Sequence, residues 1–505
     1  MTLPPSPRRV FLRRFGTLTS LAGLFLLAAA SWTTAAQVTA ARADGERAFT
    51  HVRALQAIAD ANGGNRAAGT PGYDRSADYV AGRLRDAGYD VRFEKFTFRF
   101  FEERSPPTLL SGPDRVPVPR EGLKTFTNSA AGDVTAQLRA VALGLPNDPG
   151  PPGSAAPGAA PPPSTSACEV SDFDGFERGA IALVRRGACT FQAKVNLAAA
   201  AGAAGVVVMN EGTEGRTDVV PGRLDASPIP VVGVGFALGR KLAAKAQDGA
   251  QDGAGAVRLV VEAASGTRST RNVLAELGGP GLGETVVIGA HLDGVPEGPG
   301  MNDNASGSAA VLEAALGLAQ AASASGARPT RRVRFAFWGA EEVGLVGSRH
   351  HLDTLPGERR REIVLYINLD MVGSPNFGRF VQGARTDGEG LATAASRALS
   401  GAFRFRGLAV EERPGRGPRG YGSDDASFAR LGIPTVGLHT GAGERKTDDA
   451  AALFGGAAGR AYDPCYHRAC DTAENIDQNV LGQMTEALSR AIAALTGAGE
   501  VAPDP

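Results

Sequence analysis

The chain has 505 residues, its 53 lysines and arginines are balanced by 53 aspartates and glutamates, and 43% of its residues are hydrophobic. This length predicts two folded units, and this apolar content is sufficient for a buried core. The balanced charge gives no reason to expect a nucleic-acid or membrane-surface partner.

The N-terminus has the pattern of a targeting segment, which we assign to residues 1–43. A charged start that contains Arg8 and Arg9 precedes an apolar run over residues 18–30 and small residues up to Ala36. This order is typical of a secretory signal, and the paired arginines followed by Phe-Leu resemble a twin-arginine signal; an arginine-rich ordinary signal is the alternative. The apolar run is short for a permanent anchor. We therefore expect export to the periplasm or the medium, with no membrane association after signal removal.

The four cysteines are Cys168, Cys189, Cys465 and Cys470. An even number of cysteines in an oxidising compartment predicts two disulfides, and pairing within each close couple is the economical choice. A thiolate zinc site is the competing interpretation, but the couples lie far apart and lack flanking histidines at zinc-finger spacing.

Helical spacing of apolar residues follows the signal over residues 49–60 and 73–87, and residues 89–101 then alternate as a half-buried strand does. We assign residues 44–127 to the first part of a domain that the chain completes later.

A second domain is expected over residues 128–268. Its Pro- and Gly-rich stretch, residues 146–166, precedes a predicted strand at 181–184, a helix at 191–201, and strands at 206–209 and 229–234. The turn Gly187-Ala188-Cys189-Thr190-Phe191 and the following Lys194-Val195-Asn196 closely resemble the protease-associated domain. That resemblance implies a β-rich, non-catalytic insert that influences substrate access.

Three apolar, β-branched runs carry the chemistry of the chain: residues 286–290, 333–338 and 363–369. Such runs indicate strands that are buried on both faces of a sheet. Each run ends on groups that can bind a metal, and ligands collect beyond the carboxyl ends of parallel strands. These groups are His291, Asp293, Glu341, Glu342 and Asp370.

A further acid, Asp303, lies in a turn before a predicted helix at 309–319, where its carboxylate can bridge two metals. Imidazole and carboxylate donors suit zinc, cobalt or manganese, and two adjacent ions form a hydrolytic clamp. Asp293 or a nearby backbone oxygen can orient the ring of His291. A single acid at a strand end more often caps a helix or forms a salt bridge, but the whole set predicts a metal site.

The motifs His-Leu-Asp-Gly, Asn-Asp-Asn-Ala-Ser-Gly, Trp-Gly-Ala-Glu-Glu-Val-Gly and Asn-Leu-Asp-Met-Val-Gly resemble the co-catalytic zinc aminopeptidases of metallopeptidase family 28. The segment Asp463-Pro-Cys-Tyr-His-Arg-Ala-Cys-Asp471 is similar to the last-ligand segment of secreted bacterial members. The match covers residues 50–127 and 269–497, so we assign the second part of the peptidase domain to residues 269–497 and a tail to 498–505.

The resemblance implies two zinc ions per chain. One is held by His291 and Asp370, the other by Glu342 and His467, and Asp303 bridges both. It further implies Glu341 as general base, Tyr466 as a stabiliser of the oxyanion, and a Cys465–Cys470 loop that holds Tyr466 and His467 in place.

Three further histidines and one departure from the family pattern complete the prediction. His350 and His351 are interpreted as surface or packing residues, whereas His439 ends an apolar strand and could line the substrate pocket. Asp425 stands where relatives commonly carry His, and Gly422 where some carry Arg. These two positions concern recognition of the substrate amine and leave the hydrolytic residues unchanged.

The expected fold is α/β, with a mixed, mostly parallel sheet flanked by helices and an inserted β-rich protease-associated domain. The expected function is an exported, monomeric two-zinc aminopeptidase that removes N-terminal residues from peptides. A carboxypeptidase or dipeptidase of the same family is the near alternative. A receptor-like relative without metals would lack ligands that are present here, and a glutaminyl cyclase would depart from this ligand set.

Overall fold

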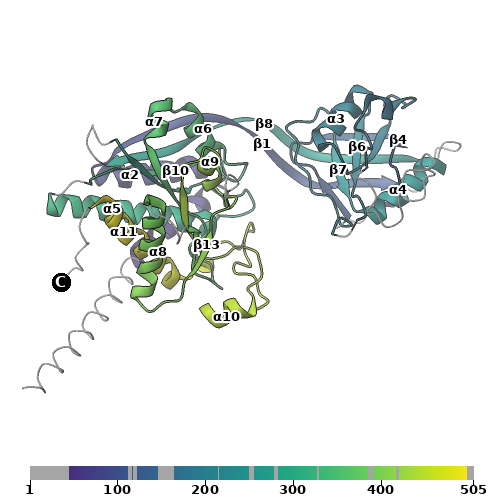
Figure 1. Ribbon diagram of the computed structural model, residues 1–505. Helices are drawn as coiled ribbons and strands as arrows, with labels where there is room; N and C mark the ends of the chain where they lie inside the picture. Colours follow the sequence, from purple (N-terminus) through teal and green to yellow (C-terminus); the bar gives the residue numbers. More distant parts are fainter. Residues whose placement is uncertain are drawn as a thin grey trace, which may run out of the picture. The chain divides into compact units, whose positions relative to one another are not determined.

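A computed structural model describes most of the chain (Figure 1). The described residues are 45–111, 116–117, 122–145, 164–213, 215–248, 255–277, 283–326, 329–384, 390–416 and 420–497. The expected signal segment, residues 146–163 of the Pro-rich stretch and the expected tail lie outside the described residues.

The chain divides into two compact units: the first contains Met1–Thr97 and Ser269–Pro505, and the second contains Phe98–Arg268. The chain leaves the first unit within β1 (Asp90–Ser111) and returns to it within β8 (Ala256–Leu277), so these two long strands contribute to both units. Each unit is described separately below.

The first unit is built on a mixed sheet with the strand order β13-β12-β14-β11-β9-β10-β8. The four central strands are parallel, whereas β8 pairs antiparallel with β10 and β12 pairs antiparallel with β14. The strands are β9 (Thr285–His291), β10 (Arg332–Trp338), β11 (Ile363–Leu369), β12 (Phe380–Ala384), β13 (Glu411–Pro414) and β14 (Thr435–His439). The three apolar runs are therefore the neighbouring core strands β9, β10 and β11, as predicted.

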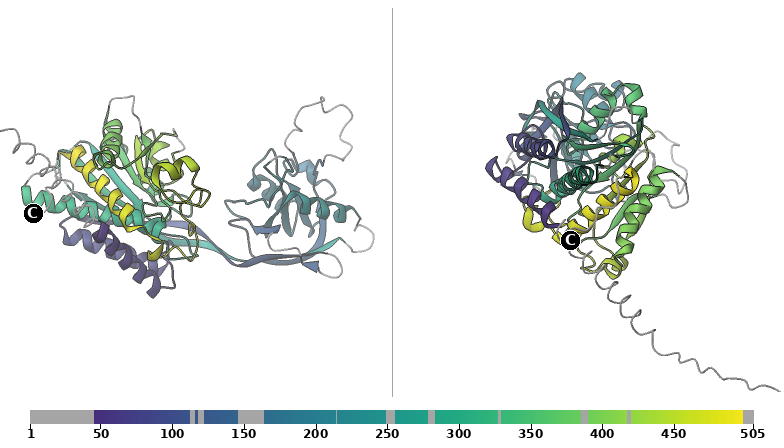
Figure 2. Two further views of the ribbon diagram at one scale, coloured as in Figure 1. Left: turned by 90° about the horizontal axis from the view of Figure 1, so that it is seen from below. Right: turned by 90° about the vertical axis from the view of Figure 1, so that its left-hand side faces the viewer.

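Helices cover both faces of this sheet (Figure 2). Alternate side chains of a strand point to opposite faces of the sheet. In β9, Val286 and Ile288 therefore pack in the hydrophobic cluster that contains α2, α5, α8 and α11. Val287 packs in the cluster on the other face, which contains α6 and α9. The helices are 45–61, α2 (Pro71–Asp86), α5 (Gly307–Ser325), α6 (Val346–Thr354), α7 (Gly357–Arg361), α8 (Leu391–Phe405), α9 (Asp425–Ala429), α10 (Asp448–Phe454) and α11 (Gln478–Thr496).

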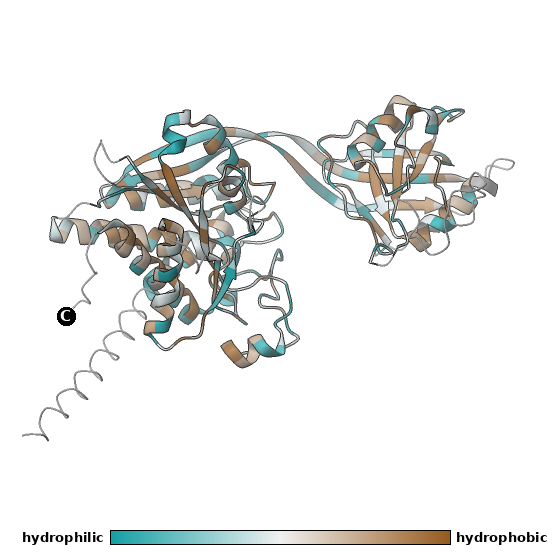
Figure 3. Ribbon diagram, in the orientation of Figure 1, coloured by the Kyte–Doolittle hydropathy of each residue, from teal (hydrophilic) through white to brown (hydrophobic). Residues whose placement is uncertain are grey.

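The burial on both faces explains the apolar character of the strands, which Figure 3 shows in brown. Every residue of β9 and of β10 is buried. The predicted α/β class and the mostly parallel sheet are confirmed. Among the described helices, none is both long enough and apolar enough to cross a membrane.

The second unit has a sheet in which β4, β5, β6 and β7 are parallel and β3 pairs antiparallel with β7. Helix α3 (Phe191–Ala200) packs on one face of this sheet and α4 (Phe236–Asp248) on the other, because alternate residues of β5 and β6 contribute to two separate cores. The strands are β2 (Val116–Pro117), β3 (Leu123–Thr125), β4 (Gly132–Ala140), β5 (Ile181–Arg185), β6 (Gly205–Met209) and β7 (Val231–Val234).

Strand β1 is longer than predicted. The alternation of apolar residues ends near Phe101, but the strand continues to Ser111 because it pairs with β8. The second unit also begins at Phe98, earlier than the expected insert boundary at residue 128, since Leu109 and Leu123 pack in its core. Its last residue is Arg268.

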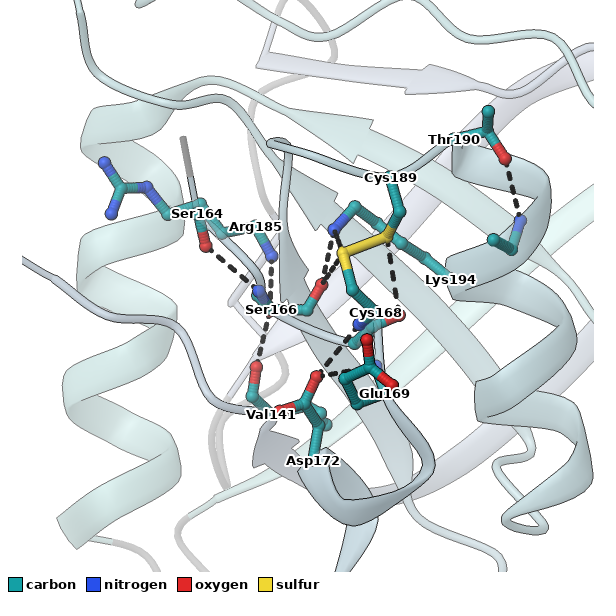
Figure 4. The surroundings of a disulfide bond; sticks show 12 residues. Val141, Ser164, Ser166, Cys168, Glu169, Asp172, Arg185, Cys189, Thr190 and Lys194 are labelled. Atoms are coloured by element: carbon teal, nitrogen blue, oxygen red, sulfur yellow. Dashed lines mark hydrogen bonds between the residues drawn. A yellow bond between two sulfur atoms is a disulfide. The ribbon is translucent and has the colours of Figure 1, made fainter. Parts of the chain in front are cut away.

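Both predicted disulfides are present, Cys168–Cys189 in the second unit and Cys465–Cys470 in the first. Figure 4 shows the surroundings of the Cys168–Cys189 bond. The buried ammonium of Lys194 lies 3.4 Å from Cys168 Sγ and also donates to the backbone oxygen of Ser166. Lys194 therefore ties helix α3 to the disulfide.

Candidate metal centre

The predicted metal-binding residues lie together at one edge of the first unit's sheet. Strands β9, β10 and β11 are parallel neighbours, so their carboxyl ends meet there. His291 is the last residue of β9 and is aligned with Trp338, the last residue of β10. Glu341 and Glu342 follow β10, and Asp370 follows β11 directly.

His291 is buried and presents its two ring nitrogens to different groups. Nδ1 lies 3.0 Å from the backbone oxygen of Asp293 and donates to it, so Nε2 is the ring nitrogen that faces the acidic side chains. Nε2 lies 3.2 Å from Asp303 Oδ1 and 3.3 Å from Asp370 Oδ1. The backbone oxygen of Asp293, rather than its carboxylate, is therefore the group that orients the imidazole.

Asp303 lies between two histidines. Its Oδ1 faces His291, and its Oδ2 lies 3.1 Å from His467 Nε2. The residue sits in a segment, Met301–Ser306, whose helical course is interrupted at Asp303 and Asn304, and the Asp303–Asn304 peptide bond is cis. A carboxylate whose two oxygens face separate imidazoles has the arrangement of a bridging ligand.

The second histidine completes a second group of donors. His467 Nε2 lies 3.2 Å from Glu342 Oε2 as well as close to Asp303. Ligand atoms lie within 4.8 Å of one another in two sets that share Asp303: one with His291 and Asp370, the other with Glu342 and His467. A further set of such atoms joins Glu341 to His291 and Glu342.

Burial and neighbouring charges give these groups unusual proton affinities. Burial raises the pKa of Glu342 to about 7, and the charge of Asp303 adds to this effect. Burial also acts to raise the pKa of Asp303, but hydrogen bonds from His291 and His467 outweigh it and lower that pKa. For His467, burial lowers the pKa, but its bonds to Asp303 and Glu342 prevail and raise it to about 10. The cluster thus concentrates negative charge that favours cations.

Glu341 has a different environment from its neighbour Glu342. Burial raises its pKa well above the usual range, the positive charge of His291 opposes this, and the buried carboxylate of Asp424 adds to it. Glu341 lines the cavity next to the metal ligands. A buried carboxylate beside a polar cavity and next to the candidate metal ligands is placed to accept and release a proton.

The carboxylate of Asp293 fixes the backbone that carries both glutamates. Its Oδ1 accepts the N–H of Glu341 at 3.1 Å, and its Oδ2 accepts the N–H of Glu342 at 3.4 Å. Asp293 is fully buried. It therefore sets the direction in which the chain leaves β10, and with it the positions of both side chains.

Three loop residues beside the centre have a left-handed backbone: Ala340 with φ 60°, Met371 with φ 55° and His467 with φ 56°. Residues with a Cβ rarely adopt this conformation, and it costs free energy that the surrounding structure must supply. Each lies within two positions of a proposed ligand or base, so the strained backbone belongs to the site.

Sequence reasoning missed several residues that position the centre. Asp471 is buried, and its two oxygens accept the backbone N–H groups of Asn302 at 2.8 Å and Asp303 at 3.0 Å. Asp463 accepts from the side chain of Asn302 at 2.6 Å and from the N–H of Cys465 at 2.8 Å. Asp463 and Asp471 are the first and last residues of the disulfide segment that resembles the family motif. Their place in that segment is the sequence feature that could have indicated their role.

Arg66 also positions the centre and is fully buried in the first unit. Its guanidinium donates to the backbone oxygens of Pro299 at 3.0 Å, Gly300 at 2.5 Å and Leu292. These carbonyls belong to the segments that carry His291 and Asp303, so Arg66 joins the two ligand loops. The sequence feature that could have indicated the role of Arg66 is the turn that precedes helix α2.

A cavity of about 320 Å³ opens onto the cluster. Tyr466 lines it, and its ring stacks on His467 with centroids 3.9 Å apart. Burial and nearby carboxylates raise the pKa of Tyr466, so its hydroxyl keeps its proton. His439 also lines the cavity, with Nδ1 2.7 Å from the backbone oxygen of Asp370.

The segment that departs from the family pattern forms another part of this cavity. Tyr421, Gly422 and Ser423 line it, whereas Asp425 supports the turn by accepting the N–H groups of Tyr421 at 2.6 Å and Ser423 at 3.2 Å. Asp425 thus holds the wall of the cavity through the backbone.

His350 and His351 take no part in the cluster and have the packing roles that the sequence suggested. His351 is fully buried, with Nε2 3.0 Å from Arg334 Nη1 and Nδ1 3.1 Å from Glu94 Oε1. His350 stacks on Phe96 with ring centroids 5.1 Å apart.

The donor set fits divalent metal ions. It combines imidazole nitrogens with carboxylate oxygens, the ligands that zinc and similar ions take in hydrolytic sites. Within the described residues, Glu342 Oε1 is buried and accepts no hydrogen bond. A buried carboxylate oxygen without a donor is costly unless a cation faces it.

Comparisons with known proteins identify both units. The model of peptidase family M28 matches residues 272–492, and that of the PA domain matches residues 154–242. An aminopeptidase of Pseudomonas aeruginosa strain PAO1 is 41% identical over 447 residues, which are 86% of this chain and 78% of that protein.

Solved structures are similar over almost the whole chain. An aminopeptidase from Aneurinibacillus sp. strain AM-1 has a TM-score of 0.64 at 25% identity, covering 93% of this chain and 98% of that one. BSAP, a zinc aminopeptidase from Bacillus subtilis, has a TM-score of 0.59 at 24% identity, covering 89% and 94%. The second likeness concerns the fold alone.

Proposed function

This chain belongs to peptidase family M28, carries a PA domain and is a metallo-exopeptidase, and we propose that it is an exported aminopeptidase using two zinc ions and a glutamate general base. The observation that carries the proposal is the position of Asp303, whose two carboxylate oxygens lie 3.2 Å and 3.1 Å from two different histidines. A carboxylate that faces two separate donor sets supports two ions rather than one.

The proposed ligands follow from this geometry. His291 and Asp370 hold one ion, Glu342 and His467 hold the other, and Asp303 is shared. When bound, two zinc ions supply Lewis acidity that activates a water and polarises the scissile carbonyl. The remaining chemistry belongs to side chains of this chain.

Glu341 is the proposed general base. It takes a proton from the attacking water and gives this proton to the amine that leaves as the peptide bond breaks. Its burial and raised pKa favour this exchange, because a base must both accept and release the proton within one turnover.

Tyr466 and Asp293 have supporting roles in the proposal. The protonated hydroxyl of Tyr466 donates a hydrogen bond to the oxyanion that develops on the substrate carbonyl. Asp293 is a positioning residue, because its carboxylate accepts the N–H groups of Glu341 and Glu342 and so aims both side chains.

Export is part of the proposal for reasons of chemistry. Both disulfides need an oxidising compartment to persist, and residues 1–43 have the order of a secretory signal. Cell fractionation would test this: the full-length protein should lose its first segment and be found outside the cytoplasm.

Paired substrates with and without a free amine test the aminopeptidase activity. Purified protein should cleave leucine anilide and not N-acetyl-leucine anilide, lose this activity to a chelator, and regain it with zinc. Cleavage of blocked peptides from a free C-terminus would instead identify a carboxypeptidase. Absence of both bound metal and turnover would contradict the enzymatic proposal.

A further inference from the structure

The cavity beside the metal centre is lined by basic residues as well as by the acidic cluster. Arg413, Arg416, Gln382 and Tyr421 line it, and we call these four residues the arginine wall. They come from strands β12 and β13 and from the segment that precedes α9. Two arginines therefore border the cavity that opens onto the acidic cluster.

Both guanidinium groups are held by the faces of aromatic rings. The guanidinium carbon of Arg413 lies 3.5 Å from the centroid of Phe380, and that of Arg416 lies 4.9 Å from the centroid of Tyr421. Stacking uses the flat face of a guanidinium and leaves its N–H groups directed outward in the plane. A planar fork of N–H donors matches the two oxygens of a carboxylate.

The wall is ordered by its own hydrogen bonds. The hydroxyl of Tyr421 donates to the backbone oxygens of Arg413, at 2.9 Å, and Pro414. The N–H of Tyr421 donates to Asp425 at 2.6 Å. The end of β13 and the turn before α9 are thus connected before any ligand arrives, which lowers the entropy cost of binding.

The arginine wall keeps positive charge although two acidic residues lie close to it. Glu411 accepts a hydrogen bond from Arg413 Nε at 2.9 Å but does not line the cavity. Glu444 does line the cavity, but its Oε2 accepts the backbone N–H of Ala442 at 3.0 Å. An apolar substrate group placed here would strip water from both guanidinium groups and replace none of the lost hydrogen bonds, which is unfavourable.

We infer that the arginine wall binds a carboxylate of the substrate, so that the enzyme prefers peptides with an acidic group one residue from the bond it cleaves. The inference rests on the proposed function, because it places the scissile bond at the metal centre. The carboxylate has two sources: the side chain of an N-terminal Glu or Asp, or the α-carboxylate at the C-terminus of a dipeptide.

The first arm of the experiment tests the side chain. Glutamyl anilide and glutaminyl anilide have nearly the same shape and differ in charge, so the ratio of their kcat/KM values isolates the carboxylate. A charge-assisted pair predicts a preference for the glutamyl substrate of roughly tenfold or more.

The second arm tests the C-terminal carboxylate. Leu-Gly and Leu-Gly-amide differ in that group alone, and release of leucine measures both. A similar preference for the free acid would identify the dipeptide source. Preferences below about twofold in both arms, relative to the tenfold that a charged hydrogen bond predicts, would overturn the inference.

Matched variants connect the preference to the wall. Arg416→Gln and Arg413→Gln each remove one cation, and the selectivity ratio should fall toward one in both. Arg397→Gln is the control, because this exposed arginine lies on α8 and does not line the cavity. If Arg413→Gln does not fold, the selectivity ratios of Arg416→Gln and of the wild type still test the inference. An unchanged ratio in Arg416→Gln would contradict the assignment.

Calorimetry separates this inference from the proposed function. The zinc-loaded protein is titrated with Glu-Gly and with Gln-Gly-amide. If Glu-Gly binds more tightly and Arg416→Gln abolishes this difference, the inference is supported even when neither peptide is hydrolysed. Absence of hydrolysis would contradict only the proposed function. Equal binding of the two peptides would overturn the inference.

Discussion

Asp471 holds the backbone of Asp303: Oδ2 of Asp471 accepts the N–H of Asp303 at 3.0 Å. The bond joins the loop after the Cys465–Cys470 disulfide to the residue that lies between the two histidines. Partners of this kind orient a ligand without touching the metal.

We predict that Asp471→Ala lowers zinc affinity or activity by about 10- to 100-fold, because the loop that carries Asp303 loses both of its acceptors. Zinc content after dialysis against a weak chelator, and kcat/KM at saturating zinc, measure the two effects. Asp449→Ala is the control, since this acid is exposed on α10. Normal zinc affinity in Asp471→Ala would show that the bond does not position Asp303.

The adjacent glutamates are expected to separate into two roles. Glu341→Gln should reduce kcat by roughly 10²- to 10⁴-fold, the usual contribution of a general base, while the protein keeps both ions. Glu342→Gln should instead lose zinc, because its carboxylate faces His467 and Asp303. Metal analysis and kinetics of the two variants, with exposed Glu358→Gln as control, decide the assignment. Loss of metal in Glu341→Gln would exchange the roles.

The two disulfides should have different consequences when removed. By the chain-entropy model, the short loop of Cys465–Cys470 contributes about 2 kcal/mol to stability and the longer loop of Cys168–Cys189 contributes about 3 kcal/mol. Only the Cys465–Cys470 loop carries Tyr466 and His467. Replacing both members of that pair by Ser should therefore lower activity and zinc affinity strongly, with only a small decrease in the melting temperature of the first unit.

The Cys168→Ser/Cys189→Ser double variant is the matched comparison. It should lower the stability of the second unit and leave zinc content unchanged, because this bond lies in the other compact unit. Calorimetric melting with metal analysis measures both. Equal loss of zinc in the two double variants would contradict the separation.

Stability should depend on pH through His351. Burial lowers its pKa, although hydrogen bonding to Glu94 opposes this, so the folded pKa lies below the ordinary value of about 6.5. As the pH falls below 6.5, the unfolded chain takes up a proton that the folded protein still excludes. The free energy of unfolding therefore decreases as the pH falls through this window, and the contribution is complete above it.

Denaturant titrations of the wild type and His351→Gln between pH 5 and pH 8 check this prediction. The stability advantage of the wild type should shrink toward low pH. His350→Gln, on the same helix, controls for the removal of a neighbouring histidine. An advantage that grows as the pH falls would reverse the sign and show that the buried ring is protonated in the folded state.

Particular residues explain what could be predicted. The runs that became β9, β10 and β11 are apolar throughout because both faces of the sheet are covered, so their continuous hydrophobicity indicated strands. The residues at and just after the strand ends indicated candidate metal ligands, and the structure places these side chains close together. The disulfide pairs followed from the number of cysteines and their spacing. Strand β1 beyond Phe101 could not be predicted, because Pro106 and Pro107 obscure a pairing that depends on β8.

The sequence by itself indicated the α/β class, the family resemblance and a candidate set of donor residues, because these depend on local periodicity and short motifs. Tertiary structure decided which groups face one another. It showed that the backbone oxygen of Asp293 orients His291 while its carboxylate holds the glutamates, and that Arg66 and Asp471 fix the ligand loops. It also placed Arg413 and Arg416 in the lining of the same cavity as the acidic cluster. These contacts join residues that are distant along the chain, and only folding brings them together.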